Sequence, residues 1–196
     1  MITIDEITIV RDGREIIYDY SEQIPAGSIT AIVGPNGCGK STLLAAIAGD
    51  IAPNKGTITI DDEHPILTPP AQLARIRAVA IQNQTYSLGF TVRQIIEMAG
   101  PSGEVMKSLE LTALADRLVT TLSGGESQRV SIATAIAQNT PVLLLDEPLS
   151  AQDVGSRKRI IELLHKLAES GITVVVVAHS DEAELTWADK VIKQFL

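Results

Sequence analysis

One short stretch of the chain holds the residue types that phosphate binding requires: Gly34–Thr42, which reads GPNGCGKST. Its glycines allow successive backbone N–H groups to point at one anion, and a lysine followed by a hydroxyl adds a positive charge and an oxygen ligand. An apolar run precedes the stretch and an Ala- and Leu-rich run follows it, so the pattern G-x-x-x-x-G-K-[ST] lies between an expected strand and an expected helix. That context favours a phosphate-binding loop over a strand–turn–helix with incidental glycines.

Within this loop, the Lys40 ammonium is expected to reach the β- and γ-phosphates of a nucleotide, and the Ser41 hydroxyl is expected to ligate Mg²⁺. The backbone N–H groups supply the remaining contacts. The predicted nucleotide-binding residues of the loop are Gly34, Pro35, Asn36, Gly37, Cys38, Gly39, Lys40, Ser41 and Thr42.

A second candidate anion site follows much later in the chain, at Leu122–Glu126, which reads LSGGE. A Ser-Gly-Gly turn that opens a helix presents bare N–H groups and a hydroxyl at the positive end of the helix dipole. Two anion sites in one small chain require an explanation.

Two carboxylates follow the apolar run PVLLL, at Asp146 and Glu147. A carboxylate at the end of a buried strand is costly unless a cation pairs with it, and Mg²⁺ bound by Asp146 would do so. Glu147 is then placed to hold an attacking water. Taken alone, this stretch fits an ordinary strand end before the Pro148 turn about equally well.

Gln82 and His179 each end another apolar run. Side chains at the carboxyl ends of buried parallel strands face the ligand crevice of such sheets. By themselves, a loop glutamine and a surface histidine are the more ordinary interpretations.

The elements that must position these residues can be read from the pattern. Two alternating runs joined by Asp12-Gly13 predict a hairpin, and strands then alternate with helices, which predicts a parallel sheet with right-handed crossovers. Predicted strands cover 2–10, 14–24, 28–33, 55–61, 76–81, 141–146, 172–178 and 190–195, and predicted helices cover 40–48, 92–117 with a break at Gly100-Pro101, 126–138, 154–169 and 181–187, with a proline-rich loop at 62–72.

Composition limits the alternatives. Of 196 residues, 45% are hydrophobic and only 3% aromatic, which predicts an aliphatic core. The net charge of −8 argues against a broad nucleic-acid-binding face, so no nucleic-acid partner is expected. The single Cys38 excludes an intramolecular disulfide and a cysteine-based zinc site. No apolar run approaches the roughly 20 residues of a membrane span, and no signal pattern opens the chain, so a cytoplasmic protein is expected.

In this order, the motifs make the whole chain resemble the ATP-binding-cassette ATPases, and LSGGE between the two nucleotide motifs is highly specific to that family. The resemblance implies one α/β domain over 1–196, a P-loop NTPase parallel sheet core with an antiparallel β side sheet and an inserted helical subdomain at about 92–138. It also implies residue roles: catalytic Glu147, His179 and Gln82, metal ligands Ser41, Gln82 and Asp146, a signature at Ser123, Gly124, Gly125 and Glu126, and a dimer-loop aspartate at Asp153.

In this family two cassettes stack head to tail, so the signature of one chain covers the γ-phosphate held by the other. The second anion site would then be half of a site shared with a homodimer or heterodimer partner. The chain departs from the family pattern at Arg11, where an aromatic residue usually stacks on adenine, and at Gln152, where leucine is usual.

The function that the resemblance implies is ATP hydrolysis with Mg²⁺ for a membrane transporter whose integral membrane subunits are separate chains, at the inner face of the cell membrane. The segments at 69–84 and 90–100 look most like importer ATPases for iron-siderophore or related metal-chelate cargo. Two alternatives stay open: a soluble switch ATPase in DNA repair, translation or cofactor assembly, and a non-catalytic nucleotide-binding module.

Overall fold

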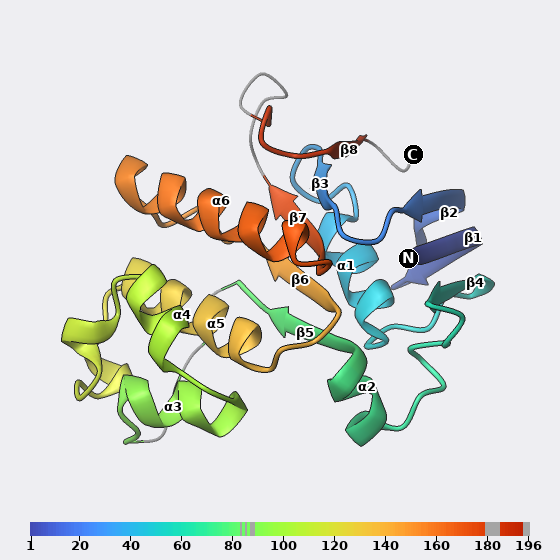
Figure 1. Ribbon diagram of the computed structural model, residues 1–196. Helices are drawn as coiled ribbons and strands as arrows, with labels where there is room; N and C mark the ends of the chain where they lie inside the picture. The colour runs from blue at the N-terminus through green and yellow to red at the C-terminus, as the bar shows by residue number, and fades with distance from the viewer. Residues whose placement is uncertain (83, 85, 87–88, 179–184, 194–196) are drawn as a thin grey trace.

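The computed structural model describes residues 1–196 except 83, 85, 87–88, 179–184 and 194–196 (Figure 1). The strands are β1 (Ile2–Arg11), β2 (Arg14–Ile24), β3 (Ile29–Val33), β4 (Lys55–Ile60), β5 (Arg77–Ala80), β6 (Val142–Asp146), β7 (Thr173–Ala178) and β8 (Lys190–Lys193). The helices are α1 (Lys40–Ala48), α2 (Pro70–Ile76), α3 (Val92–Ala99), α4 (Gly103–Ser108), α5 (Gly124–Ala137) and α6 (Val154–Glu169), with short 3₁₀ turns at Thr112–Leu114 and Val119–Thr121.

A five-stranded sheet forms the centre of the protein, in the order β5-β6-β7-β3-β8. Every neighbouring pair is parallel, so the carboxyl ends of all five strands lie at one edge. Parallel strands are buried on both faces, which is why these runs are continuously apolar instead of alternating. The predicted α/β fold with a parallel core is confirmed.

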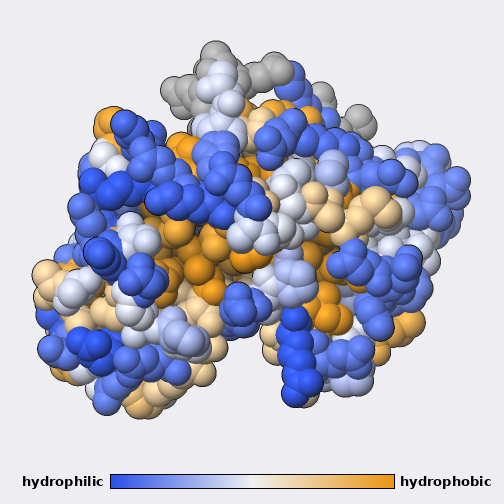
Figure 2. All heavy atoms as spheres, in the orientation of Figure 1, coloured by the Kyte–Doolittle hydropathy of each residue, from blue (hydrophilic) through white to orange (hydrophobic). Residues whose placement is uncertain are grey.

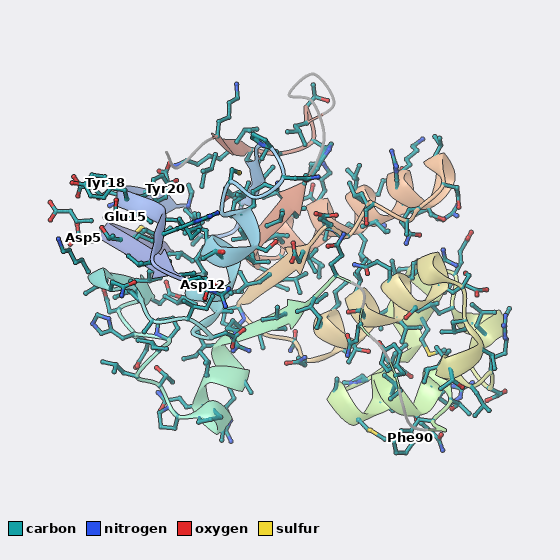
Figure 3. All side chains as sticks on the ribbon, turned by 180° about the vertical axis from the view of Figure 1, so that it is seen from behind. Asp5, Asp12, Glu15, Tyr18, Tyr20 and Phe90 are labelled. Carbon is teal, nitrogen blue, oxygen red and sulfur yellow. The ribbon has the colours of Figure 1, made fainter. Side chains whose placement is uncertain are left out.

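A second, antiparallel sheet of order β2-β1-β4 lies beside the first. The β1–β2 hairpin turns at Asp12 and Gly13, which both have left-handed φ values of 51° and 75°. Such a pair suits the two-residue hairpin turn whose twist matches the flanking strands. Seen from behind in Figure 3, Asp5, Glu15 and Tyr18 lie on the outer part of this sheet, whereas Asp12 lies nearer to α1. The predicted antiparallel side sheet is also confirmed.

The parallel sheet separates two hydrophobic clusters. On one face, α3–α6 pack on residues such as Leu143, Leu145 and Val176. On the other face, α1 and the antiparallel sheet pack on Leu144 and Val177. Among the described residues, the fully buried large side chains are all isoleucines and leucines, as the low aromatic content predicts. The helices α3–α5 therefore share their core with the central sheet.

Local structure differs from the sequence prediction in two described places. Helix α2 begins at Pro70, inside the predicted loop at 62–72, because proline suits the first turn of a helix where its missing N–H costs nothing. The predicted helix at 92–117 divides into α3, the six-residue α4 and a 3₁₀ turn, with Glu110 in the left-handed region at φ 53°. The predicted helix at 181–187 lies largely outside the described residues.

None of the helices in the described part of the chain combines the length and apolar character needed to cross a membrane.

Candidate functional site

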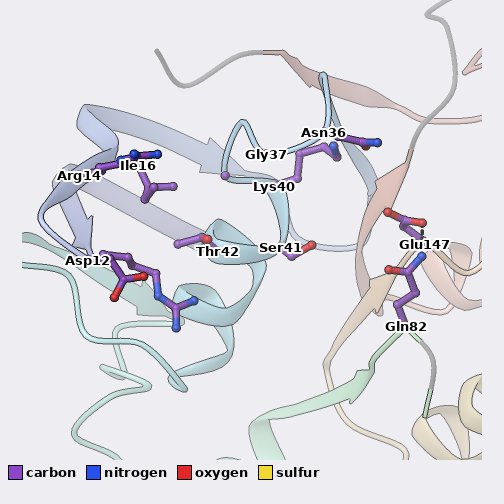
Figure 4. A pocket seen from close by; sticks show the side chains of 12 residues that line it. Asp12, Arg14, Ile16, Asn36, Gly37, Lys40, Ser41, Thr42, Gln82 and Glu147 are labelled. Atoms are coloured by element: carbon purple, nitrogen blue, oxygen red, sulfur yellow. Dashed lines mark hydrogen bonds between the residues drawn. The ribbon is translucent and has the colours of Figure 1, made fainter.

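A cleft of about 940 Å³ opens at the carboxyl edge of the parallel sheet (Figure 4). This volume lies within the usual range for small-molecule sites. The β1–β2 hairpin contributes Arg11, Asp12, Arg14 and Ile16. The loop after β3 and the first turn of α1 contribute Asn36, Gly37, Gly39, Lys40, Ser41 and Thr42. The ends of β5 and β6 contribute Gln82 and Glu147.

The backbone of the phosphate loop depends on its glycines. Gly37 and Gly39 have φ values of 80° and 103°, which side chains other than glycine rarely adopt. A Cβ on Gly39 would also lie 3.0 Å from Ile16 Cγ2 on the hairpin. Gly39 is the N-terminal flanking residue of α1, so the first N–H groups of that helix open into the cleft and form an anion site.

Lys40 lines this cleft, but its ammonium donates hydrogen bonds to the loop's own carbonyl oxygens. Nζ lies 2.9 Å from the Gly34 oxygen and 3.0 Å from the Pro35 oxygen, and the residue is only 5% exposed. The loop thus fixes the charge close to its own backbone. A bound phosphate would replace these two carbonyl oxygens as the hydrogen-bond acceptor of the Lys40 ammonium.

Cys38 belongs to the hydrophobic core and not to the cleft wall. It is 7% exposed and packs in the same cluster as Ile32 and Leu43. A Cβ on Gly34 would lie 2.8 Å from its Sγ. The Cys38 side chain therefore packs in the core and does not face the cleft.

The candidate Mg²⁺ ligands Ser41 and Asp146 are brought together by the sheet. The Ser41 Oγ donates to Asp146 Oδ1 at 3.2 Å, although 105 residues separate them in the chain. A hydroxyl and a carboxylate oxygen beside a phosphate loop are the ligand types that Mg²⁺ prefers. The residues present therefore fit this ion.

Glu147 follows β6 in a strained conformation, with φ 50°. Left-handed backbone at a non-glycine residue costs about 1 kcal/mol or more and often marks functional sites. Its N–H donates to the Val177 oxygen at 3.1 Å, which fixes the strained residue to β7. The side chain is 9% exposed and accepts a hydrogen bond from Gln82 Nε2 (Figure 4). The structure therefore brings these two predicted catalytic residues into contact, and His179 lies outside the described residues.

The signature residues start helix α5 and are not among the described residues that line the cleft. Ser123 and Glu126 form a capping box, because Glu126 N–H donates to Ser123 Oγ at 3.3 Å and Ser123 N–H donates to Glu126 Oε2 at 2.7 Å. The hydrogen bond from the Ser123 backbone, supported by the charge of Arg117, holds the pKa of Glu126 below its ordinary value. Glu126 thus stabilises the turn, and Ser123 and Gly124 are its exposed residues.

Asp153 likewise begins a helix, α6. Its carboxylate accepts hydrogen bonds from Ser156 N at 2.9 Å and Ser156 Oγ at 2.8 Å. The backbone bond is the main cause that lowers the pKa of Asp153. The predicted dimer-loop aspartate is therefore an N-cap within this chain, outside the cleft.

Sequence reasoning named Arg11 on the hairpin and missed three neighbours that also line the cleft: Asp12, Arg14 and Ile16. The sequence could have indicated these residues, because the predicted turn at Asp12-Gly13 places the end of the first strand beside the start of the second. In Figure 4 the hairpin residues Asp12, Arg14 and Ile16 lie on one side of the cleft, and Gln82 and Glu147 lie on the other.

Replacing Arg11 with tyrosine is expected to tighten ATP binding about five-fold, because an aromatic ring covers more of a stacked base than a guanidinium does. Titration with a fluorescent ATP analogue measures this, and Arg75→Tyr on α2, outside the cleft, is the matched control. An unchanged dissociation constant would show that Arg11 is not at the base.

The fold and the cleft together define a P-loop nucleotide-binding protein. The model of the family described as ABC transporter matches residues 17–150. The hemin import ATP-binding protein HmuV of Rhodococcus jostii is 38% identical over 202 residues, which cover 96% of this chain and 69% of that protein. The chain belongs to the ABC transporter family, and it is an ATP-binding-cassette ATPase.

Solved structures of ABC transporter proteins have the same fold. A dimeric bacterial ABC transporter cassette superposes with a TM-score of 0.84 at 28% identity, covering 99% of this chain and 94% of that one. The protein cbiO1 of Clostridium perfringens, part of the ABC transporter complex cbiONQ, gives a TM-score of 0.80 at 27% identity, covering 99% and 84% of the two chains.

Proposed function

We propose that two cassettes, either two copies of this chain or this chain and a related one, close head to tail on ATP, and that hydrolysis reopens them. The observation that supports this most is the separation of the two predicted anion sites. The phosphate loop lies in the cleft with Gln82 and Glu147, whereas Ser123–Gly125 begin α5 elsewhere. A signature turn that is absent from its own chain's cleft can complete the cleft of a partner.

In this mechanism the phosphate loop binds the triphosphate through its N–H groups and Lys40. Mg²⁺ held at Ser41 and Asp146 would neutralise phosphate charge. Glu147 orients the attacking water and accepts its proton, and for this its carboxylate must exchange Gln82 for the water. We assign Gln82 a second position near the metal, which makes its movement part of forming the competent site.

The signature contributes only when the partner closes. The hydroxyl of Ser123 and the N–H groups of the α5 N-terminus would then face the γ-phosphate at the positive end of the helix dipole. Hydrolysis converts the γ-phosphate of ATP into free inorganic phosphate, and dissociation of that phosphate removes the charge that these groups bind, so the closed dimer loses its main stabilising contact. We propose the region at about 92–138 as the subdomain that carries this turn.

We further propose that the chain lies at the inner face of the cell membrane and docks on separate membrane-spanning subunits. Figure 2 shows a notch between the α3–α5 helices and α2, with apolar side chains coloured orange along it. Ile81, beside Gln82, is 53% exposed, and Met98 on α3 is 64% exposed. A partner helix inserted beside Gln82 would link transporter movement to the catalytic glutamate.

The relatives named for hemin import support an iron-containing chelate, such as heme or a siderophore complex, as the imported cargo. The cargo would pass through the membrane subunits without touching this chain. ATP hydrolysis by the complex reconstituted in lipid vesicles should rise when such a chelate is supplied with its binding protein.

The docking surface is tested with Ile81→Asp. Placing a charge at an exposed apolar anchor is expected to reduce co-purification with the membrane subunits at least ten-fold. Leu67→Asp is the matched control, because Leu67 is 78% exposed but lies in the loop before α2. Equal recovery of both variants would place the docking surface elsewhere.

A further inference from the structure

Gln152 occupies a position where the sequence departs from the family pattern, and its side chain is buried, at 6% exposure. It lies in the loop between β6 and α6, next to Asp153. A buried amide requires partners for its N–H and its oxygen, since an unpaired group there costs free energy. The positions of these partners therefore show what the side chain holds together.

Both partners of the amide belong to helix α5, which begins with the signature turn. Gln152 Nε2 donates to the Gly125 carbonyl oxygen at 3.0 Å, and Gln152 Oε1 accepts from Arg129 Nη1 at 3.1 Å. A carbonyl only accepts and a guanidinium only donates, so these partners define the orientation of the amide. Gly125 and Arg129 are four residues apart on one face of the helix.

The loop and the helix also touch through their backbones. A Cβ on Gly125 would lie 2.7 Å from the Ala151 oxygen, whereas one on Gly124 would meet nothing within 4 Å. Of the two signature glycines, Gly125 is therefore required for contact within the chain. The Gln152 side chain adds two directed hydrogen bonds to this close approach.

The other end of the loop is attached to the catalytic residue. Ser150 donates to the Glu147 carbonyl oxygen from its N–H at 3.2 Å and from its hydroxyl at 3.0 Å. Arg157 Nε on α6 donates to the oxygens of Leu149 and Gln152, both at 3.1 Å. The segment from Glu147 to Gln152 is thus a short, hydrogen-bonded connection.

We propose that Gln152 is a positioning residue that fixes the signature turn of a chain to that chain's own catalytic loop, so that the half-site offered to a partner and the site used in the chain's own cleft move together. The role in turnover rests on the proposed head-to-tail function. The link within one chain rests only on the contacts described above.

The test is Gln152→Met, which keeps the side-chain length and removes both hydrogen bonds. ATP binding to the isolated chain should stay within about two-fold, because Gln152 is not in the cleft, whereas kcat and ATP-driven dimerisation should fall roughly ten-fold. Gln128→Met is the matched control: Gln128 is equally buried on α5, and neither of the contacts to the loop involves it. A double-mutant cycle with Arg129→Met should be non-additive, since each of the two changes removes the same Gln152–Arg129 hydrogen bond.

Hydrogen exchange of the backbone amides at 123–127 tests the contact between Gln152 and α5 independently of ATPase activity. In Gln152→Met these amides should exchange roughly ten-fold faster, with those of the phosphate loop unchanged. Wild-type exchange rates in Gln152→Met would overturn the inference whatever its activity. An unchanged kcat in Gln152→Met would also overturn it, provided that the wild-type protein hydrolyses ATP in the same assay. Faster exchange in a chain whose wild type hydrolyses no ATP would support the link and contradict the proposed function instead.

Discussion

Glu147→Gln is expected to keep ATP binding and to lose turnover by roughly 100-fold or more, the usual contribution of a positioned general base. The phosphate loop supplies the binding energy and contains no part of this residue. A glutamine retains the shape but accepts no proton, so the ATP-bound dimer should accumulate because hydrolysis no longer opens it.

Size-exclusion chromatography with Mg-ATP detects that dimer, and phosphate release measures turnover. The matched control is Glu162→Gln on α6, which removes the same charge from an exposed side chain paired with Lys158. Glu162→Gln should behave as wild type. Wild-type turnover in Glu147→Gln would remove Glu147 from the catalytic role and direct attention to another base.

A mixture of two inactive variants is expected to recover activity. Lys40→Ala disables the phosphate loop, and Ser123→Arg places a long cation in the signature turn. In each homodimer both shared sites contain one damaged half, so turnover should fall roughly 100-fold in each. In the mixed dimer one site combines both damaged halves, and the other combines two intact halves, so mixing should restore one working site.

The assay requires a high protein concentration and an active wild type. Lys166→Ala on α6 is the control, because it removes the same charge far from the phosphate loop. Alone, and mixed with Ser123→Arg, it should behave as wild-type chains do. A mixture as inactive as its parents leaves two possibilities: the sites work only together, or the site is not shared. A crosslink between Asn36→Cys of one chain and Ser123→Cys of the other, in a Cys38→Ala background, separates these two possibilities, because Asn36 is exposed in the phosphate loop and needs no positive φ. Failure of ATP to promote the crosslink refutes the shared site.

The structure also gives physical reasons for the residues that were predicted from local pattern. The glycines of the phosphate loop were recognisable because positive φ values such as those of Gly37 and Gly39 almost require that residue type. Ser123 was predicted in a turn that opens a helix, and the structure shows it as the N-cap of α5. Its capping box with Glu126 starts the helix at Gly124, two residues before the predicted start at 126.

Local sequence pattern predicts the α/β class, most of the element types and the residues at the ends of the strands, since these follow from apolar periodicity and glycine placement over a few neighbouring positions. It misses helix α2 and the division of the predicted helix at 92–117. Tertiary structure alone decided which of these residues meet. The contacts of Ser41 with Asp146, of Gln82 with Glu147 and of Gln152 with Gly125 all depend on the strand order β5-β6-β7-β3-β8 and on helix packing. Such contacts join segments tens of residues apart, and no local pattern encodes their distance. The same reason explains why Cys38 points into the core although its neighbours face the cleft.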